Sequence, residues 1–322
     1  MAEKNQSCFR TSIGGQALIE GILMRGPQRQ AIVVRNQDGE LVEKEEELKL
    51  IRDRYPILGW PLIRGVVNFL DSMVKGVQAL MYSADFYPDD GTPEEPSRFE
   101  KWLEKHFSSK KLQSLAVGLS VFLGIGLSVA LFLVLPTFLT GGLLHFFPGF
   151  PLWGRNVLEG LLKIVIFMVY LILCSRMKDM KRVFSYHGAE HKTIFCYEAG
   201  LPLTVENVRI QPRHHPRCGT SFLFVVIFVS ILFSSVVFSF WRFTNAGLRT
   251  LVHLALLPVV VAVTYEFNRW VGRHDNALTR FLTAPGMWMQ NFTTNEPDDS
   301  MIEVAIRALQ LVVPEEKGKD AW

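Results

Sequence analysis

The chain has 322 residues, 49% of them hydrophobic, and a mean hydropathy of +0.19. Long uncharged runs alternate with charged segments, which indicates a multi-pass membrane protein with a substantial water-facing part. The net charge of +3 is too small to indicate nucleic-acid binding, and the basic residues flank the apolar runs, where membrane topology accounts for them. Four cysteines without a C-x-x-C pair fit a reducing compartment.

The N-terminal part predicts a small β element. Ala31 to Arg35 and Glu40 to Lys44 are strand-like runs, and the turn between them ends in Asp38-Gly39. Because glycine adopts positive φ easily, this pattern predicts a β-hairpin. The segment from Gly14 to Gly21 is either a further strand, with glycines that allow close backbone approach, or a helix.

The next segment, Pro61 to Asp85, has the periodicity of an amphipathic helix. At about 100° per residue, its large apolar side chains cover one half of the helix and its polar side chains the other. Proline suits a first helical position. We expect this helix either to lie in the membrane interface or to pack across the end of the helical bundle. An acidic, proline-rich linker follows.

Four segments are long enough to cross a bilayer: Leu112 to about Leu139, Val157 to Ser175, Thr220 to Trp241, and Leu248 to Tyr265. Glu159 and Lys163 lie one turn apart and can neutralise each other. His253 has no companion charge at its depth, so we expect it to bond to a neighbouring helix. The fold class we predict is a mainly α membrane protein with about four transmembrane helices, an amphipathic interfacial helix and a small N-terminal β element.

Composition divides the chain into six parts. They are an N-terminal cytosolic β-containing module (1–56), an amphipathic helix with an acidic linker (57–97), a first helical hairpin in the membrane (98–177), a cytosolic metal-ligand loop (178–219), a second membrane hairpin (220–272) and a C-terminal cytosolic helical tail (273–322). In the tail, acidic residues precede the apolar-periodic Met301 to Val313, which predicts a helix that begins there and packs on the N-terminal module.

Candidate metal ligands gather in the polar stretch between the second and third spans. His187 and His191 lie one turn apart on a predicted helix with Glu190 beside them, which is the H-x-x-E-H arrangement of inverzincin metallohydrolases. His215 and Cys218 follow, and their two-residue gap lets both point at one ion. Imidazole and thiolate are favoured ligands of zinc. We therefore predict a divalent metal, zinc, held by these two histidines together with His215 and Cys218.

The number of ligands decides what this metal does. Four ligands close a tetrahedral zinc, whereas three leave a position for a water that the metal makes acidic. Glu190 is then the candidate general base, and Arg217 or Lys192 would stabilise a developing oxyanion. Helix geometry places Glu198 about 16 Å from His187. Glu198 could therefore join the same metal only if the helix breaks, whereas the sequence cannot place Glu20 and Glu266 relative to the ion.

Several blocks resemble the signature blocks of the YqhQ family. They occur in order from Gly14 to Ala308: Gly14 to Pro27, Trp60 to Gly65, Tyr186 to Ile194, His215 to Phe222, and Glu296-Pro297 ahead of Glu303 to Ala305. The family consists of bacterial membrane proteins of unknown function that are often described as predicted metal-dependent enzymes. The resemblance implies a multi-pass protein of the bacterial cytoplasmic membrane and names no substrate.

Three functions fit the sequence. The first is a metal-dependent hydrolase that acts on an amide, a peptide or a lipid head-group ester at the cytosolic membrane interface. The second is a non-catalytic scaffold or assembly factor whose structural zinc fixes the loop. The third is a small-solute transporter with His253 along its path, although four spans offer little room for one. The lipid bilayer is the expected partner, together with a small-molecule, peptide or lipid substrate, and no nucleic acid is expected.

Loop charges predict the orientation. The loop from Arg176 to Arg217 is rich in Lys and Arg, whereas Thr140 to Asn156 holds only Arg155. By the positive-inside rule, both termini and the first of these loops are cytosolic. We expect reporter fusions to give a cytosolic signal after Leu201 and a periplasmic signal after Gly149. A periplasmic signal after Leu201 would contradict this topology.

Overall fold

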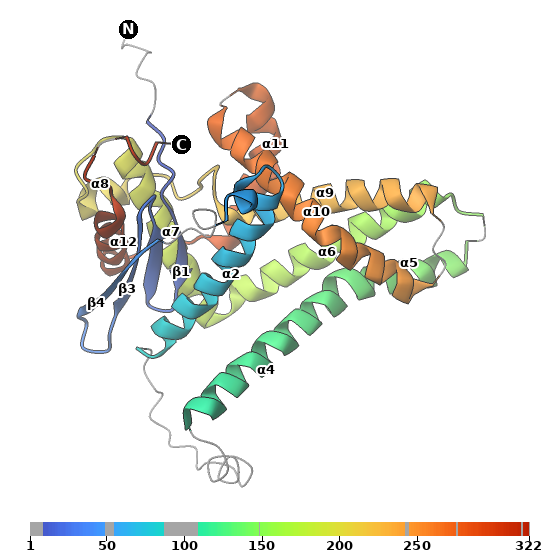
Figure 1. Cartoon of the computed structure of the whole chain (residues 1–322), viewed down its shortest axis with the longest axis horizontal. Coiled ribbons are helices and arrows are strands. Elements are labelled where there is room, and N and C mark those ends of the chain that lie inside the picture. The colour runs from blue at the N-terminus through green and yellow to red at the C-terminus, as the bar shows by residue number, and fades with distance from the viewer. Residues whose placement is uncertain are drawn as a thin grey trace. The chain divides into compact units, whose positions relative to one another are not determined.

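The computed structural model describes residues 9–48, 55–86, 109–147, 149–241, 245–274, 276–316 and 318–321 (Figure 1). The chain forms two compact units, and each gathers stretches that are far apart in sequence. The first, which we call the sheet unit, comprises Met1–Tyr87, Tyr170–Ser230 and Leu257–Trp322. The second, the helical unit, comprises Pro88–Val169 and Ile231–Leu256.

A four-stranded antiparallel sheet in the order β1-β2-β3-β4 forms the centre of the sheet unit; its strands are Gly14–Leu18, Gly21–Arg25, Arg29–Arg35 and Leu41–Glu47. The predicted hairpin is confirmed as β3 and β4. Gly39 in its turn has φ of 83°, and its N–H donates to the carbonyl of Asn36 at 3.1 Å. The helix alternative for Gly14 to Gly21 is wrong, because this segment forms β1, a turn that contains Glu20, and the start of β2, with which β1 pairs.

Helices cover both faces of the sheet (Figure 1). On one face lie α7 (Lys178–Glu198) and α12 (Asp299–Val312). Their shared core with the sheet is fully buried and includes Ile22, Met24, Val33, Tyr186, Ala189, Val304 and Leu309. The acidic start predicted for the last helix is confirmed, since the Asp298 side chain accepts the N–H of Met301 at 3.0 Å. On the other face, Leu18, Leu23, Ile32 and Val34 pack against Ala79 of α2.

The helix α2 (Ile63–Ala84) fully buries only small residues, while many of its large apolar side chains are exposed. It follows a short 3-10 helix, η1 (Pro56–Gly59), and starts two residues later than predicted. Its buried residues are Gly65, Gly76, Ala79 and Ser83. Its exposed residues include Ile63, Leu70, Met73, Val74, Val77 and Leu80. The described part of the chain therefore leaves much of the apolar face of this helix uncovered.

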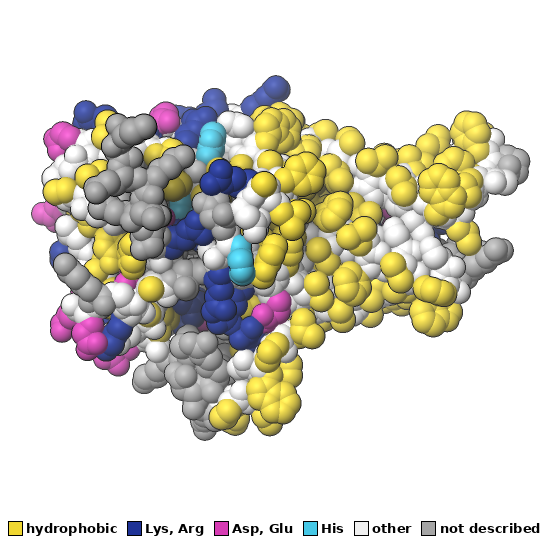
Figure 2. Space-filling view, turned by 90° about the horizontal axis from the view of Figure 1, so that it is seen from above, with side chains coloured by type: hydrophobic (Ala, Val, Ile, Leu, Met, Phe, Trp, Pro, Cys, Tyr) yellow, Lys and Arg dark blue, Asp and Glu magenta, His cyan; other side chains and the backbone are white. Residues whose placement is uncertain are grey.

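Four helices are long and apolar enough to cross a membrane, as predicted. The first candidate span, Gly118–His145, runs through α4 (Ser109–Val129), the π-helical turn η2 (Ala130–Val134) and α5 (Leu135–His145). The others are α6 (Leu152–Arg176), α9 (Gly219–Phe240) and α10 (Ala246–Arg273). Figure 2 shows hydrophobic side chains gathered over these helices. Two further helices, α8 (Val205–Arg209) and α11 (Ala277–Thr293), belong to the sheet unit.

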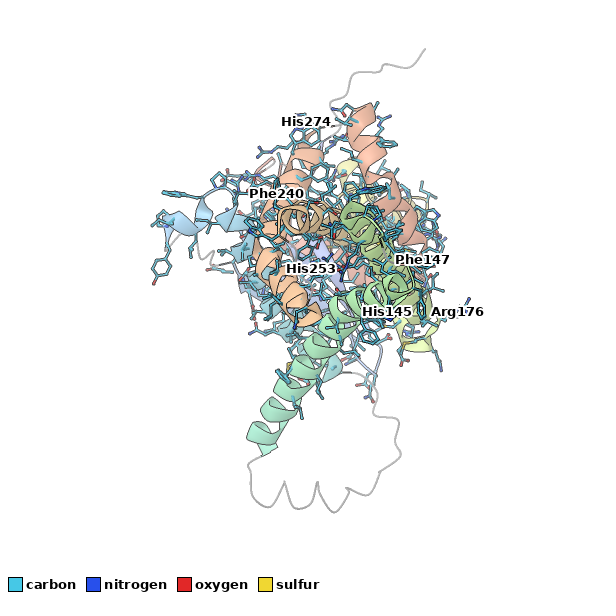
Figure 3. All side chains as sticks on the ribbon, turned by 90° about the vertical axis from the view of Figure 1, so that its right-hand side faces the viewer. His145, Phe147, Arg176, Phe240, His253 and His274 are labelled. Carbon is cyan, nitrogen blue, oxygen red and sulfur yellow. The ribbon has the colours of Figure 1, made fainter. Side chains whose placement is uncertain are left out.

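Charged side chains meet inside the helical unit, where His253 lies among the helices (Figure 3). The Glu159 carboxylate is 2% exposed and lies 2.9 Å from Thr137 Oγ1, 2.9 Å from His253 Nε2 and 2.8 Å from Arg249 Nε. The Lys163 ammonium is 3.4 Å from Glu159 and 3.2 Å from His253. The expectation that this histidine has no companion charge is wrong, because α10 brings it against α6. Such pairing is what lets ionised groups stay buried.

Gly188 allows α7 to approach the segment that follows α11. A Cβ at this position would clash with the carbonyl oxygen of Asn295. We expect Gly188→Ala to lower the free energy of unfolding by about 1–3 kcal/mol through overpacking, measured as a lower melting temperature of the protein in detergent. Gly118→Ala is the control, because no atom of the described residues lies within 4 Å of that Cβ and alanine favours helix. Equal melting of wild type and both variants would contradict this packing.

Candidate metal centre

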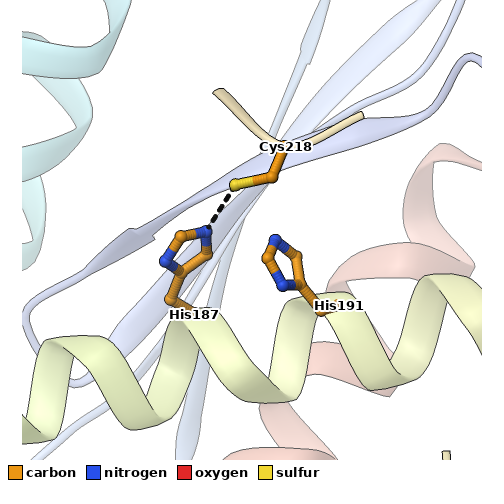
Figure 4. Close-up of side chains that lie close together, drawn as sticks. All are labelled: His187, His191 and Cys218. Carbon is orange, nitrogen blue, oxygen red and sulfur yellow. Dashed lines mark hydrogen bonds between the residues drawn. The ribbon is translucent and has the colours of Figure 1, made fainter. Parts of the chain in front are cut away.

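Three side chains from two elements form a compact group of metal-ligand atoms (Figure 4). His187 and His191 lie one turn apart on α7, with ring centroids 4.4 Å apart. Cys218 comes from the turn that leads into α9, and its Sγ is 3.2 Å from Nε2 of His187. One ligand atom from each of the three residues lies within 4.8 Å of the others. The structure thus brings together three of the four predicted ligands.

Main-chain carbonyls fix the orientation of both imidazole rings. Nδ1 of His187 lies 2.8 Å from the carbonyl oxygen of Thr293, and Nδ1 of His191 lies 2.5 Å from that of Arg213. A carbonyl can only accept, so each Nδ1 carries the proton and donates it. Each ring then directs Nε2 into the group, which is the arrangement that holds histidine ligands around metals. Nε2 of His191 is buried and has no partner among the described residues.

The charges of His187 and Cys218 stabilise each other. Burial disfavours both charged forms, but Cys218, with smaller contributions from Glu190 and the Thr293 carbonyl, outweighs it and raises the pKa of His187 to about 9. Likewise, burial raises the pKa of Cys218, but the two histidines lower it well below its ordinary value. The first turn of α9 adds to this, since Thr220 N is 3.4 Å from Sγ. The protonated His187 carries a proton on Nε2, the atom that would bind the metal. Metal binding would therefore release this proton.

Glu190 lies on α7 between the two histidines and is 5% exposed. Its Oε1 accepts the N–H of Gly15 from β1 at 2.9 Å, while Oε2 is buried without a partner among the described residues. Burial raises the pKa of Glu190 and outweighs the opposing effect of the histidines. A carboxyl group whose pKa is raised exchanges protons more readily near neutral pH, as a general base or acid requires.

His215 lies outside this group. Gln290 of α11 holds its main chain, accepting its N–H at 2.7 Å and donating to its carbonyl at 2.8 Å. Its Nε2 is 3.3 Å from Nη2 of Arg217 and 3.9 Å from Glu198. Burial, reinforced by the charge of Arg217, lowers the pKa of His215 to about 4, so the ring is neutral at physiological pH.

The other polar residues singled out in the sequence have partners elsewhere. Arg217 forms an ion pair with Glu198, and both line a cavity of about 440 Å³. Lys192 is buried and pairs with Glu296 at 2.8 Å. The remaining candidate carboxylates also pair with arginines: Glu20 with Arg182 at 2.5 Å and Glu266 with Arg64. None of these belongs to the group of three ligand atoms.

Sequence reasoning missed the residues that support the ligands. The carbonyls of Thr293 and Arg213 orient the rings, the amide of Gly15 binds Glu190, and the Gln290 side chain holds the turn before Cys218. The carbonyls of Thr293 and Arg213 could come from any residue type, so no residue pattern could have identified these two. Gly15 is the one signal in the sequence that the backbone there approaches another group closely.

Four candidate spans and a His-His-Cys group, in which His191 and Cys218 are buried, define a multi-pass membrane protein with a candidate metal site. The family model described as "Protein of unknown function (DUF1385)" matches residues 60–315. The chain is also 34% identical over 305 residues to "Uncharacterized protein YqhQ" of Bacillus subtilis (strain 168), which covers 92% of this chain and 90% of that protein. The chain therefore belongs to this family of unknown function. No solved structure matches it.

The three-residue group predicts which substitutions release a metal. We expect the purified protein to carry about one metal ion per chain, and His187→Ala and Cys218→Ala to lose it, measured by elemental analysis. His215→Ala should retain it. Matched controls are Cys196→Ala, at another buried cysteine, and His274→Ala, at an exposed histidine. Wild-type protein purified without chelators and free of metal would contradict the site.

Proposed function

We propose that this protein is a metal-dependent membrane hydrolase with zinc bound by His187, His191 and Cys218. The observation that carries the proposal is Nε2 of His191, which is buried beside Cys218 without a hydrogen-bond partner among the described residues, while Nδ1 holds the ring in place. A buried acceptor without a partner is costly unless something binds it. Two imidazoles and a thiolate form a donor set that suits zinc.

His187, His191 and Cys218 would hold the ion, and a zinc there would supply the acidity that lets a water act as a nucleophile near neutral pH. Glu190 is the residue we assign to accept its proton. Its Oε1 is held by the Gly15 amide, which leaves Oε2 to exchange the proton. The hydrogen bond fixes the carboxyl group, and burial keeps its pKa raised.

We place the site at the cytosolic membrane interface. Cys218 immediately precedes α9, one of the four candidate spans, so the metal group lies beside the end of an apolar helix. The loop that carries both histidines is rich in Lys and Arg, which favours the cytosolic side. A substrate with an apolar part would reach such a site from the bilayer.

Burial supports a second function, a scaffold with a structural zinc. His191 is 1% and Cys218 is 7% exposed. Structural zinc sites are usually closed to solvent, and their metal contributes directly to folding. In this case the ion would fix the turn before α9 to α7, and the protein would act in assembly. Glu190 distinguishes the two functions, because only hydrolysis needs its proton-accepting oxygen.

The substitution Glu190→Gln tests the hydrolase directly. The amide keeps the shape of the side chain and still accepts the Gly15 N–H, but it cannot take a proton. We expect normal metal content and melting temperature together with loss of function, measured as failure to complement the phenotype of a deletion strain. Glu206→Gln is the control, because the Glu206 side chain is exposed on α8 and does not belong to the metal-ligand group.

A structural zinc gives the opposite pattern. Glu190→Gln would then complement fully, while His191→Ala would fail because the protein loses its metal and its folded state. That pair of results would overturn the hydrolase in favour of the scaffold.

A further inference from the structure

A polar cavity of about 450 Å³ lies between the sheet and α2. The side chains that matter for its chemistry are Gln16, Arg25, Asn68, Ser72, Lys75 and Tyr265. This volume is typical of pockets that hold a small molecule or a headgroup. The cavity belongs entirely to the sheet unit.

An apolar groove of about 330 Å³ adjoins this cavity along α2. Its apolar lining is Phe69, Met73, Val77 and Leu80. The cavity and the groove share Gln16 and Ser72 in their linings, so the polar space opens directly into the apolar one. A ligand that filled both would have a polar end and an apolar chain.

The cavity carries an excess of positive charge. Arg25 and Lys75 share a single carboxylate, Asp71, at 2.5 Å and 3.5 Å. Arg25 and Lys75 are the charged side chains of the described lining, and Asp71 is the one carboxylate among the described residues that pairs with both. The polar end of the ligand should therefore be anionic.

The groove lies at the level where a membrane surface is expected. Arg64 of α2 pairs with Glu266 of α10, and Asn68 donates to the Tyr265 hydroxyl at 2.8 Å. These two residues of α10 lie where its apolar run ends. Tyrosine is typical of the interface between lipid and water. The uncovered apolar face of α2 continues outward from the groove, as expected of a helix that lies in that interface.

We propose that the cavity and the groove bind one anionic glycerophospholipid, with its phosphate near Arg25 and Lys75 and an acyl chain along Val77 and Leu80. As a substrate assignment this rests on the proposed hydrolase function. Gly15 connects the two sites, because it lines the cavity and donates its N–H to Glu190. The lipid headgroup would thus lie beside strand β1, whose Gly15 amide is bonded to Glu190, the residue assigned as the base.

Lipid binding can be measured without turnover. The full-length protein in neutral detergent is titrated with phosphatidylglycerol or phosphatidylcholine, and bound lipid is counted by native mass spectrometry. We expect one phosphatidylglycerol per chain, bound roughly tenfold more tightly than phosphatidylcholine. Lys75→Glu should remove this preference. Lys178→Glu should keep it, since that lysine is exposed and does not line the cavity.

Two valines on α2 provide a matched pair of substitutions that tests the groove. Val77 and Val74 are both exposed on α2, but only the first lines the groove. We expect Val77→Gln to weaken phosphatidylglycerol binding roughly tenfold and Val74→Gln to leave it unchanged. Ser72→Trp, at an exposed position where the cavity meets the groove, should abolish binding without unfolding the protein.

Two outcomes overturn the proposal: equal binding of both lipids by the wild type, or equal effects of the two valine substitutions. Glycerol 3-phosphate that binds as tightly as the lipid would also overturn it, because the groove would then contribute nothing. His187→Ala separates this proposal from the hydrolase. If this variant still binds the lipid but the wild-type protein proves to contain no metal, only the hydrolase is refuted. If the wild-type protein contains metal but does not prefer phosphatidylglycerol, only the lipid site is refuted.

Discussion

Two hydrogen bonds to main-chain carbonyls determine the chemistry of the centre. Thr293 is the last residue of α11, and Arg213 lies in the loop after α8. Each of their carbonyls nevertheless accepts a hydrogen bond from Nδ1 of one of the two histidines on α7. Each bond places the proton on Nδ1 and so turns Nε2 toward Cys218. Without them, either ring could flip or change tautomer, and the three ligand atoms would not share a centre. The packing of α7 against the end of α11 therefore serves the site as well as the fold.

The sheet connects this centre to α2 on its other face. Met24 on β2 packs toward α7, whereas its neighbour Leu23 packs toward α2, as alternation along a strand requires. The edge strand β1 is exposed at Gly15, where its amide is bonded by Glu190 and its backbone borders the polar cavity. A glycine suits this position, since a Cβ would come within 3.1 Å of the Glu190 carboxyl carbon. The proposed base and the proposed lipid site thus depend on the same strand.

The helical unit stabilises its buried charges in a different way. Glu159 receives hydrogen bonds from three neighbours, and the Arg249 guanidinium also lies 3.9 Å from the centre of the Phe238 ring. Removing one partner of such a cluster would leave an uncompensated charge in an apolar environment, which is far more costly than leaving the pair intact. The cluster fixes α5, α6 and α10 relative to one another. Both oxygens of the Glu159 carboxylate have partners, whereas Nε2 of His191 and Oε2 of Glu190 have none among the described residues.

Periodicity and ligand chemistry were enough to predict the four spans, the hairpin at Gly39, the helix after Asp298 and the pairing of His187 with His191, because each depends on residues close together in the chain. Tertiary structure decided the rest. Cys218 joined the histidines while His215 turned toward Glu198, although both belong to one short motif, because Gln290 holds that turn from a distant helix. The companions of His253 come from α6, about 90 residues away. The outward apolar face of α2 also depends on contacts that form only after folding, since Gly76 and Ala79 fit against the sheet where larger side chains would not.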